Sequence, residues 1–137
     1  MIQLSSLPSI YLSPKDVKAK VLIVDDEPGW RDLLSYELSP REFEISIAGN
    51  PSEALFLLNQ RSFDLIITDV RMPGPMDGID LVETYRLQNP LQKVIFITGY
   101  ATDEKLAEAT QSKHSACLKK PFNIEMLFDE IEKLIQK

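Results

Sequence analysis

Three short, uninterrupted apolar runs constrain the fold of this 137-residue chain more than any other feature. They cover residues 21–24, 65–67 and 94–97, and a polar residue follows each run directly. Such runs are typical of strands that are buried on both faces of a parallel sheet. Two weaker candidates for strands, residues 42–48 and 115–119, flank the strong ones in sequence. The sequence therefore predicts five strands.

Helical patterns fill the gaps between these strands, at residues 30–38, 50–60, 79 to about 89, 102–111 and 124–135. Asn50, Pro51 and Glu53 occupy the positions typical of the N-cap, first and third residues of a helix. The last segment carries the clearest amphipathic stripe. Strands that alternate with helices predict an α/β fold, a mostly parallel sheet, and helices on both of its faces.

Length and composition favour one soluble domain. Residues 1–18 are rich in serine and proline, and we interpret them as an N-terminal extension, possibly a linker, before a domain at 19–137. The formal net charge of −6 argues against nucleic acid as a direct partner. The single cysteine, Cys117, predicts a reducing cytoplasm, and no apolar run is long enough to span a membrane.

Reactive side chains follow the predicted strands: Asp25, Asp26, Asp69, Thr98 and Lys120. In open parallel sheets, sites form at the carboxyl ends of the strands. Three carboxylates gathered there repel one another, and oxygen ligands of this kind suit Mg²⁺. A cation and a lysine beside a carboxylate would neutralise an incoming phosphoryl group, and the carboxylate could become an aspartyl-phosphate. The pattern predicts phosphoryl chemistry.

Five short motifs in this order resemble the response-regulator receiver family of two-component signalling, over roughly residues 20–137. The resemblance implies a flavodoxin-like (βα)5 fold, a doubly wound parallel sheet with strand order 2-1-3-4-5. The motifs are Val24-Asp25-Asp26-Glu27, Asp69-Val70-Arg71-Met72-Pro73, Met76-Asp77-Gly78, Thr98-Gly99 and Lys120-Pro121-Phe122.

The resemblance also implies roles for single residues. Asp69 would be the phosphoacceptor, Thr98 the switch hydroxyl, and Lys120 the cation that pairs with phosphate, before a bond to Pro121 that is usually cis. The Mg²⁺ ligands would be Asp26, Asp69 and the backbone carbonyl of Arg71, with Asp25 beside the ion or bound to it through water. The phosphoryl donor would be a sensor histidine kinase or a phosphotransfer protein. The domain would catalyse only its own phosphorylation and dephosphorylation, switch contact with an output partner, and possibly form a homodimer.

The sequence departs from the family pattern at two places. Cys117 stands where the family usually carries Tyr or Phe. In the family, that aromatic ring turns inward when the switch hydroxyl moves toward the phosphoryl group, and Tyr100 is the candidate substitute for it here. The segment 73–76 is one residue longer than usual, through Gly74 or Pro75. These departures motivate one alternative, a pseudo-receiver that binds partners without phosphorylation. A second alternative is an aspartate-nucleophile phosphatase of the haloacid-dehalogenase type, which Arg71 disfavours because that family has a second Asp there.

Overall fold

The computed structural model describes residues 19–41, 43–99 and 104–135. Within them, five strands alternate with five helices, as the sequence predicts. The interpretations of residues 1–18, of Tyr100 and of the first residues of the helix at 102–111 lie outside the described residues. The elements are β1 (Ala19–Val24), α1 (Pro28–Leu38), β2 (Phe43–Ala48), α2 (Pro51–Gln60), β3 (Leu65–Asp69), α3 (Gly78–Arg86), β4 (Val94–Thr98), α4 (Glu104–Ala109), β5 (Ser115–Lys119) and α5 (Ile124–Ile135).

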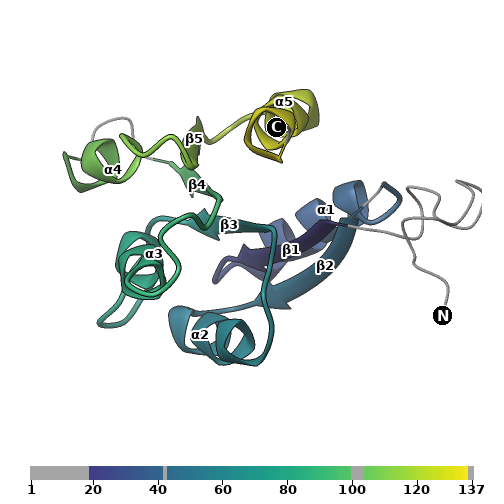
Figure 1. Ribbon diagram of the computed structural model, residues 1–137. Coiled ribbons are helices and arrows are strands. Elements are labelled where there is room, and N and C mark those ends of the chain that lie inside the picture. Colours follow the sequence, from purple (N-terminus) through teal and green to yellow (C-terminus); the bar gives the residue numbers. More distant parts are fainter. Residues whose placement is uncertain (1–18, 42, 100–103, 136–137) are drawn as a thin grey trace, which may run out of the picture.

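All neighbouring strands pair in parallel, in the order β2-β1-β3-β4-β5. The prediction of a flavodoxin-like, doubly wound sheet is therefore confirmed. The chain runs from β1 outward to β2, then crosses back over β1 to β3 and continues to the opposite edge (Figure 1). The direction of winding reverses between β1 and β3, and a crevice for a ligand forms at this point in such sheets.

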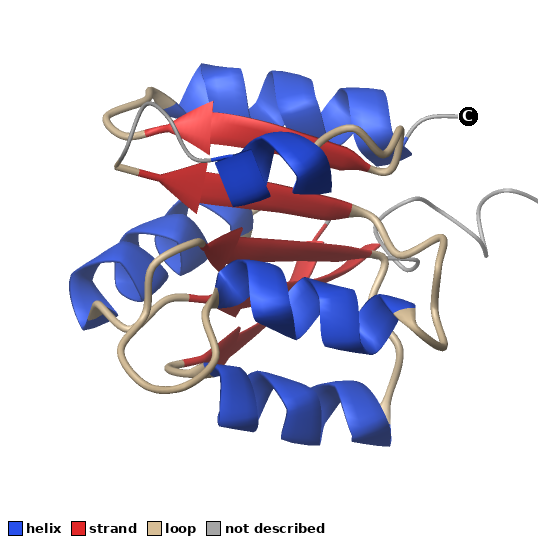
Figure 2. Ribbon diagram, turned by 90° about the vertical axis from the view of Figure 1, so that its left-hand side faces the viewer, coloured by secondary structure: helices blue, strands red, loops and turns tan. Residues whose placement is uncertain are grey.

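Two apolar cores, one on each face of the sheet, explain the uninterrupted apolar runs. In β1, Leu22 and Val24 belong to the core beneath α2, α3 and α4, while Val21 and Ile23 belong to the core beneath α1 and α5. The same division of helices is visible in Figures 1 and 2. Side chains alternate between the faces of a strand, so a strand covered by helices on both sides needs apolar residues at every position.

Local signals at the start of α2 act as the sequence predicts. The Asn50 side chain accepts a hydrogen bond from the Glu53 N–H at 2.8 Å, and a Glu53 carboxylate oxygen accepts one from the Gly49 N–H at 2.7 Å. These contacts satisfy N–H groups that have no partner within the helix. Among the described helices, none combines the length and the apolar character that crossing a membrane requires.

The start of α3 lies one residue earlier than the apolar pattern from Ile79 suggests. Asp77 is the N-cap, and its side chain accepts from the Asp80 N–H at 2.8 Å while Asp80 accepts from the Asp77 N–H at 3.1 Å. This capping box fixes where the chain enters the helix after β3. Gly78, the first helical residue, is buried against the end of β3.

Candidate functional site

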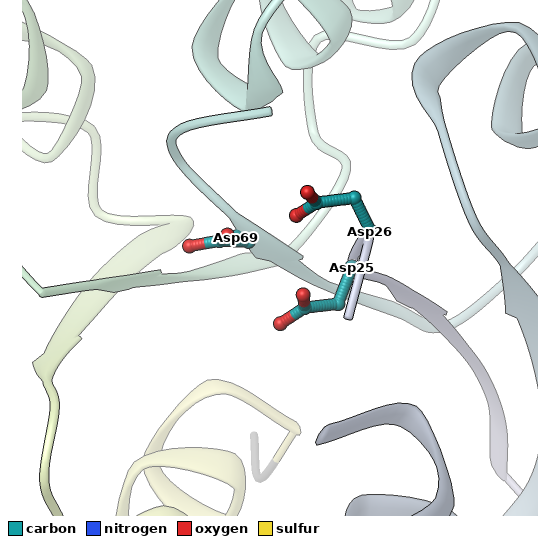
Figure 3. Close-up of side chains that lie close together, drawn as sticks. All are labelled: Asp25, Asp26 and Asp69. Atoms are coloured by element: carbon teal, nitrogen blue, oxygen red, sulfur yellow. The ribbon is translucent and has the colours of Figure 1, made fainter. Parts of the chain in front are cut away.

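Three carboxylates meet at the carboxyl ends of β1 and β3. Asp25 and Asp26 follow β1, and Asp69 is the last residue of β3. One oxygen from each can be chosen so that all three lie within 4.8 Å of one another. Figure 3 shows the three side chains close together at the ends of the two neighbouring strands. They stand beside the reversal in strand order, because β1 and β3 pair directly.

Burial makes this cluster electrostatically costly. Asp25 is 2% exposed and Asp69 is 8% exposed, whereas Asp26 is exposed. Burial first, and then the charge of Asp25, raises the pKa of Asp69 to about 6, although Lys120 opposes the rise. Burial also raises the pKa of Asp25, against the opposing effects of the Glu27 N–H and of Lys120. The site therefore favours a bound cation over three free carboxylates.

Two hydrogen bonds hold Asp25 in place. An Asp25 carboxylate oxygen accepts a hydrogen bond from the Glu27 N–H at 2.9 Å. The Arg31 guanidinium, one turn into α1, donates to the Asp25 carbonyl at 2.7 Å. The loop from β1 to α1 is thus fixed at both ends. The sequence patterns drew no attention to Arg31, since a lone arginine on a helix carries no signal of this contact.

The backbone of Asp69 is fixed equally closely. Its carbonyl oxygen accepts a hydrogen bond from the Thr68 hydroxyl at 2.9 Å. The next residue, Val70, donates its N–H to the Ile97 carbonyl at 2.9 Å and accepts from the Gly78 N–H at 2.8 Å. Asp69 is therefore held between β4 and the start of α3.

Lys120 contributes a positive charge to the site from the end of β5, the edge strand next to β4. It follows β5, its N–H donates to the Thr98 carbonyl at 2.7 Å, and its bond to Pro121 is cis, as the family resemblance implies. Its ammonium nitrogen lies 3.6 Å from an oxygen of Asp25, 3.9 Å from one of Asp69, and 3.5 Å from one of Glu27. Lys119, by contrast, is exposed.

An aromatic pair stands beside this ammonium group. The Trp30 ring lies 4.6 Å from the Lys120 nitrogen and stacks on Phe122, with ring centroids 5.5 Å apart and planes at 29°. Trp30 is the first residue of the helical pattern at 30–38, and that pattern gives no sign of the stacking. Glu27 belongs to a quoted motif, yet its contact with Lys120 was not anticipated either.

The remaining predicted residues occupy the same edge of the sheet. Thr98 ends β4 and is 3% exposed, and it pairs with Lys119 of β5 in register. Arg71 lies two residues beyond Asp69, and its side chain is exposed. The extra loop residues are exposed as well, and Gly74 takes a φ of 108°, a conformation that favours glycine. Cys117 is exposed on β5, and partial burial raises the pKa of its thiol, so nothing marks it as reactive.

The donor set fits a hard divalent cation. Three carboxylate oxygens lie close enough together to share one ion, and oxygen is the ligand type that Mg²⁺ prefers. A cation there would offset the repulsion that raises the pKa of Asp69. Asp26, the exposed member of the set, would leave such an ion accessible from solvent.

Comparison with known proteins identifies the family. The sequence model of the family named response regulator receiver domain matches residues 21–132 of this chain. The response regulator protein PilR of Pseudomonas aeruginosa is 36% identical over 107 residues, which cover 78% of this chain and 24% of PilR. The receiver protein CpdR of Brucella abortus is 30% identical over 116 residues, which cover 85% of this chain and 96% of CpdR.

A solved structure agrees with this match. The response regulator TrrA of Thermotoga maritima, in complex with Mg²⁺ and beryllofluoride, superposes with a TM-score of 0.74 at 31% identity, over 85% of this chain and 98% of TrrA. The chain spans about a quarter of the length of PilR. These matches leave no support for the phosphatase alternative. The fold, the carboxylate cluster and the comparisons together show that the chain belongs to the response regulator receiver domain family.

Proposed function

We propose that this chain accepts a phosphoryl group on Asp69 from the phosphohistidine of a sensor kinase or phosphotransfer protein. The observation that carries the proposal is the setting of the Asp69 carboxylate, which is 8% exposed and lies 3.9 Å from the Lys120 ammonium nitrogen. Two further carboxylates, those of Asp25 and Asp26, lie close enough to bind a cation together with it. The match to response regulators, which are partners of histidine kinases, supports this donor. We place the exchange in the cytoplasm.

Asp25, Asp26, Asp69 and the backbone carbonyl of Arg71 are the proposed ligands of Mg²⁺. The ion would supply positive charge for the oxygens of the transferred group. The complex of TrrA with Mg²⁺ and beryllofluoride supports this choice of ion. Asp26 is the exposed member of the set, and the two buried members need the ion most.

The proposed transfer is an in-line displacement at phosphorus. A carboxylate oxygen of Asp69 forms the new P–O bond while the P–N bond to the donor imidazole breaks, and the imidazole nitrogen takes the electron pair. Lys120 balances negative charge on the phosphoryl oxygens, for which its ammonium group needs to move little from its position beside Asp69. Hydrolysis of the aspartyl-phosphate by water resets the domain, so the chain catalyses only its own modification.

Thr98 is the proposed sensor of the phosphoryl group. Its hydroxyl-bearing side chain is nearly buried at the end of β4, between β3 and β5. A hydrogen bond from that hydroxyl to a phosphoryl oxygen would favour one packing of α4, β5 and α5 over another, which is a population shift. The output partner, or a second copy of the chain, would bind to that surface.

The test is phosphorylation by a small donor, followed by intact mass. Incubation with Mg²⁺ and acetyl phosphate should add the mass of one phosphoryl group, and excess EDTA should prevent it. Asp69→Asn should abolish the gain, while Asp32→Asn, which removes an exposed carboxylate of α1, should leave it unchanged. No gain in the wild-type chain, or a gain that survives Asp69→Asn, would refute the proposal and favour a binding module that works without phosphorylation.

A further inference from the structure

The ammonium group of Lys120 touches none of its acidic neighbours at close hydrogen-bonding range. Its three nearest carboxylate oxygens, on Glu27, Asp25 and Asp69, lie at 3.5, 3.6 and 3.9 Å. Strong bonds between an ammonium and a carboxylate are shorter, at roughly 2.7–2.9 Å. The acidic residues attract the charge without fixing where it sits. Another contact must then limit the space that the lysine side chain explores.

Trp30 supplies that contact. The Lys120 nitrogen lies 4.6 Å from the ring, well within the roughly 6 Å over which an aromatic face attracts a cation. The lysine side chain is 16% exposed, and such an attraction strengthens as water is removed. Among the aromatic side chains, tryptophan provides the most attractive face. The ring therefore forms one wall of the space in which the ammonium group is held.

The ring itself is held in place by Phe122, which lies two residues beyond Lys120. The two rings stack at 5.5 Å, so the start of α1 and the loop after β5 are locked together at this point. Trp30 is half-buried, and Phe122 is half-buried as well. The stacking therefore fixes the position of the Trp30 indole relative to Lys120, which is two residues before Phe122.

We propose, on the basis of the proposed function, that Trp30 is a positioning residue that keeps the Lys120 ammonium beside Asp69 for phosphoryl transfer. A lysine side chain has many accessible rotamers, and one that is confined in advance loses less conformational freedom when the phosphoryl group arrives. Trp30 is not one of the proposed ligands of Mg²⁺. Its effect passes through the position of Lys120.

Two substitutions separate the aromatic face from mere bulk. Trp30→Leu keeps an apolar side chain but removes the face, and Trp30→Phe keeps a weaker face. The rate constant for phosphorylation by acetyl phosphate, followed by intact mass at saturating Mg²⁺, should fall about fivefold in Trp30→Leu and about twofold in Trp30→Phe, the range that a cation–π contact implies. The dissociation constant for Mg²⁺ should stay within about twofold of wild type, since Trp30 holds no ligand.

Coupling to Lys120 distinguishes positioning from a structural effect. In a Lys120→Met background, adding Trp30→Leu should lower the remaining rate less than about 1.5-fold, because the group that the ring positions is gone. Full multiplication of the two losses would overturn the proposal. So would equal rates for wild type and Trp30→Leu.

Proton NMR tests the geometry without any phosphorylation. The Lys120 Cε protons should resonate upfield of those of the other lysines because they lie near the face of the indole. Trp30→Leu should abolish this shift, and Glu27→Gln should preserve it. A spectrum without the shift in wild type would reject the inference. If the shift is present but the wild-type chain takes up no phosphoryl group, the proposed function fails while the placement of Lys120 by Trp30 stands.

Discussion

Gly78, the first residue of α3, packs so closely on the carbonyl oxygen of Asp69 that no side chain fits between them. A methyl group built on Gly78 would overlap that oxygen and would crowd the Thr68 hydroxyl, at 2.9 Å. The Gly78 N–H also donates to the Val70 carbonyl at 2.8 Å. The backbone of the proposed phosphoacceptor and the start of α3 are therefore positioned as one unit.

Gly78→Ala should consequently damage both stability and the site. Overpacking of a tight interior contact costs about 1–3 kcal/mol, and relief of the overlap requires the Asp69 backbone to move. We expect urea denaturation to show a loss of that size, and phosphorylation by acetyl phosphate to slow at least tenfold, since small displacements of reacting groups are costly.

Gly29→Ala is the matched control. Nothing lies within 4 Å of a methyl group built on Gly29, which sits within α1. Alanine is the better helix former, so this variant should be slightly more stable than wild type, by about 0.4–1 kcal/mol. A Gly78→Ala protein as stable as Gly29→Ala would contradict the close packing described above.

Asp69→Asn should stabilise the cation-free protein at neutral pH. The folded-state pKa of Asp69 is raised to about 6 from an ordinary value of 3.8, so the folded chain binds a proton more tightly than the unfolded chain does. The ionised carboxylate thus costs stability as pH rises from about 4 to about 6, and the full cost persists above that range. A rise in pKa of this size corresponds to a loss of up to about 3 kcal/mol in the free energy of unfolding.

Urea titrations of both proteins in EDTA, between pH 4 and pH 8, measure this cost. The stability advantage of Asp69→Asn should be greatest above pH 6.5 and should shrink as pH falls toward 4. Saturating Mg²⁺ should reverse the order at pH 7.5, because the wild type gains a ligand that Asn replaces poorly. An advantage that is constant across this pH range would show that Asp69 titrates normally.

Affinity for Mg²⁺ should depend on pH through the same carboxylate. A ligand must be ionised to bind the ion, so protons compete with Mg²⁺ below the pKa of Asp69, at about 6. Isothermal titration calorimetry should give a nearly constant dissociation constant between pH 7.5 and 8.5. Below pH 6 the constant should rise roughly tenfold per pH unit, and more steeply if Asp25, whose pKa is also raised, takes up a second proton. A flat profile down to pH 5 would be incompatible with Asp69 as a ligand.

The carboxylate cluster could be predicted from the sequence because it follows from the topology of the sheet. Asp25 and Asp26 follow one strong apolar run, Asp69 lies two residues beyond another, and parallel strands bring such ends to one edge. The start of α2 was equally predictable, since Asn50 and Glu53 act on groups within one turn. Both inferences need only local spacing and the direction of the strands.

The contacts around Lys120 could not be predicted from the sequence because they depend on side-chain packing between segments that are distant along the chain. Glu27 and Lys120 are 93 positions apart and meet only when α1 and the loop after β5 pack together. The stacking of Trp30 on Phe122 has the same origin. The consequence of Cys117 for signalling stays a prediction: Cys117 is exposed, and the candidate aromatic substitute Tyr100 lies outside the described residues.

An ion-pair cluster joins α4 to α3, and it too escaped the sequence patterns. The Lys105 ammonium nitrogen lies 2.6 Å from an oxygen of Asp80 and 3.2 Å from one of Asp77, the two residues of the capping box that begins α3. Hydrogen bonding from Lys105 lowers the pKa of Asp80. Of the described residues of α4, only Leu106 is buried, so this cluster adds to a small number of apolar contacts that hold the helix.

Lys105→Met should therefore loosen α4 with little effect on the rest of the fold. The three side chains are 29–43% exposed, which limits the loss of global stability to less than about 1 kcal/mol. Amide hydrogen exchange within residues 106–110 should quicken about threefold, because a locally opened helix needs few other contacts broken. In the wild type, 1 M salt should produce part of the same change by screening the charges. Lys113→Met, which removes an exposed lysine before β5, should leave exchange in α4 unaltered. Equal exchange in the two variants would mean that Leu106 alone secures the helix.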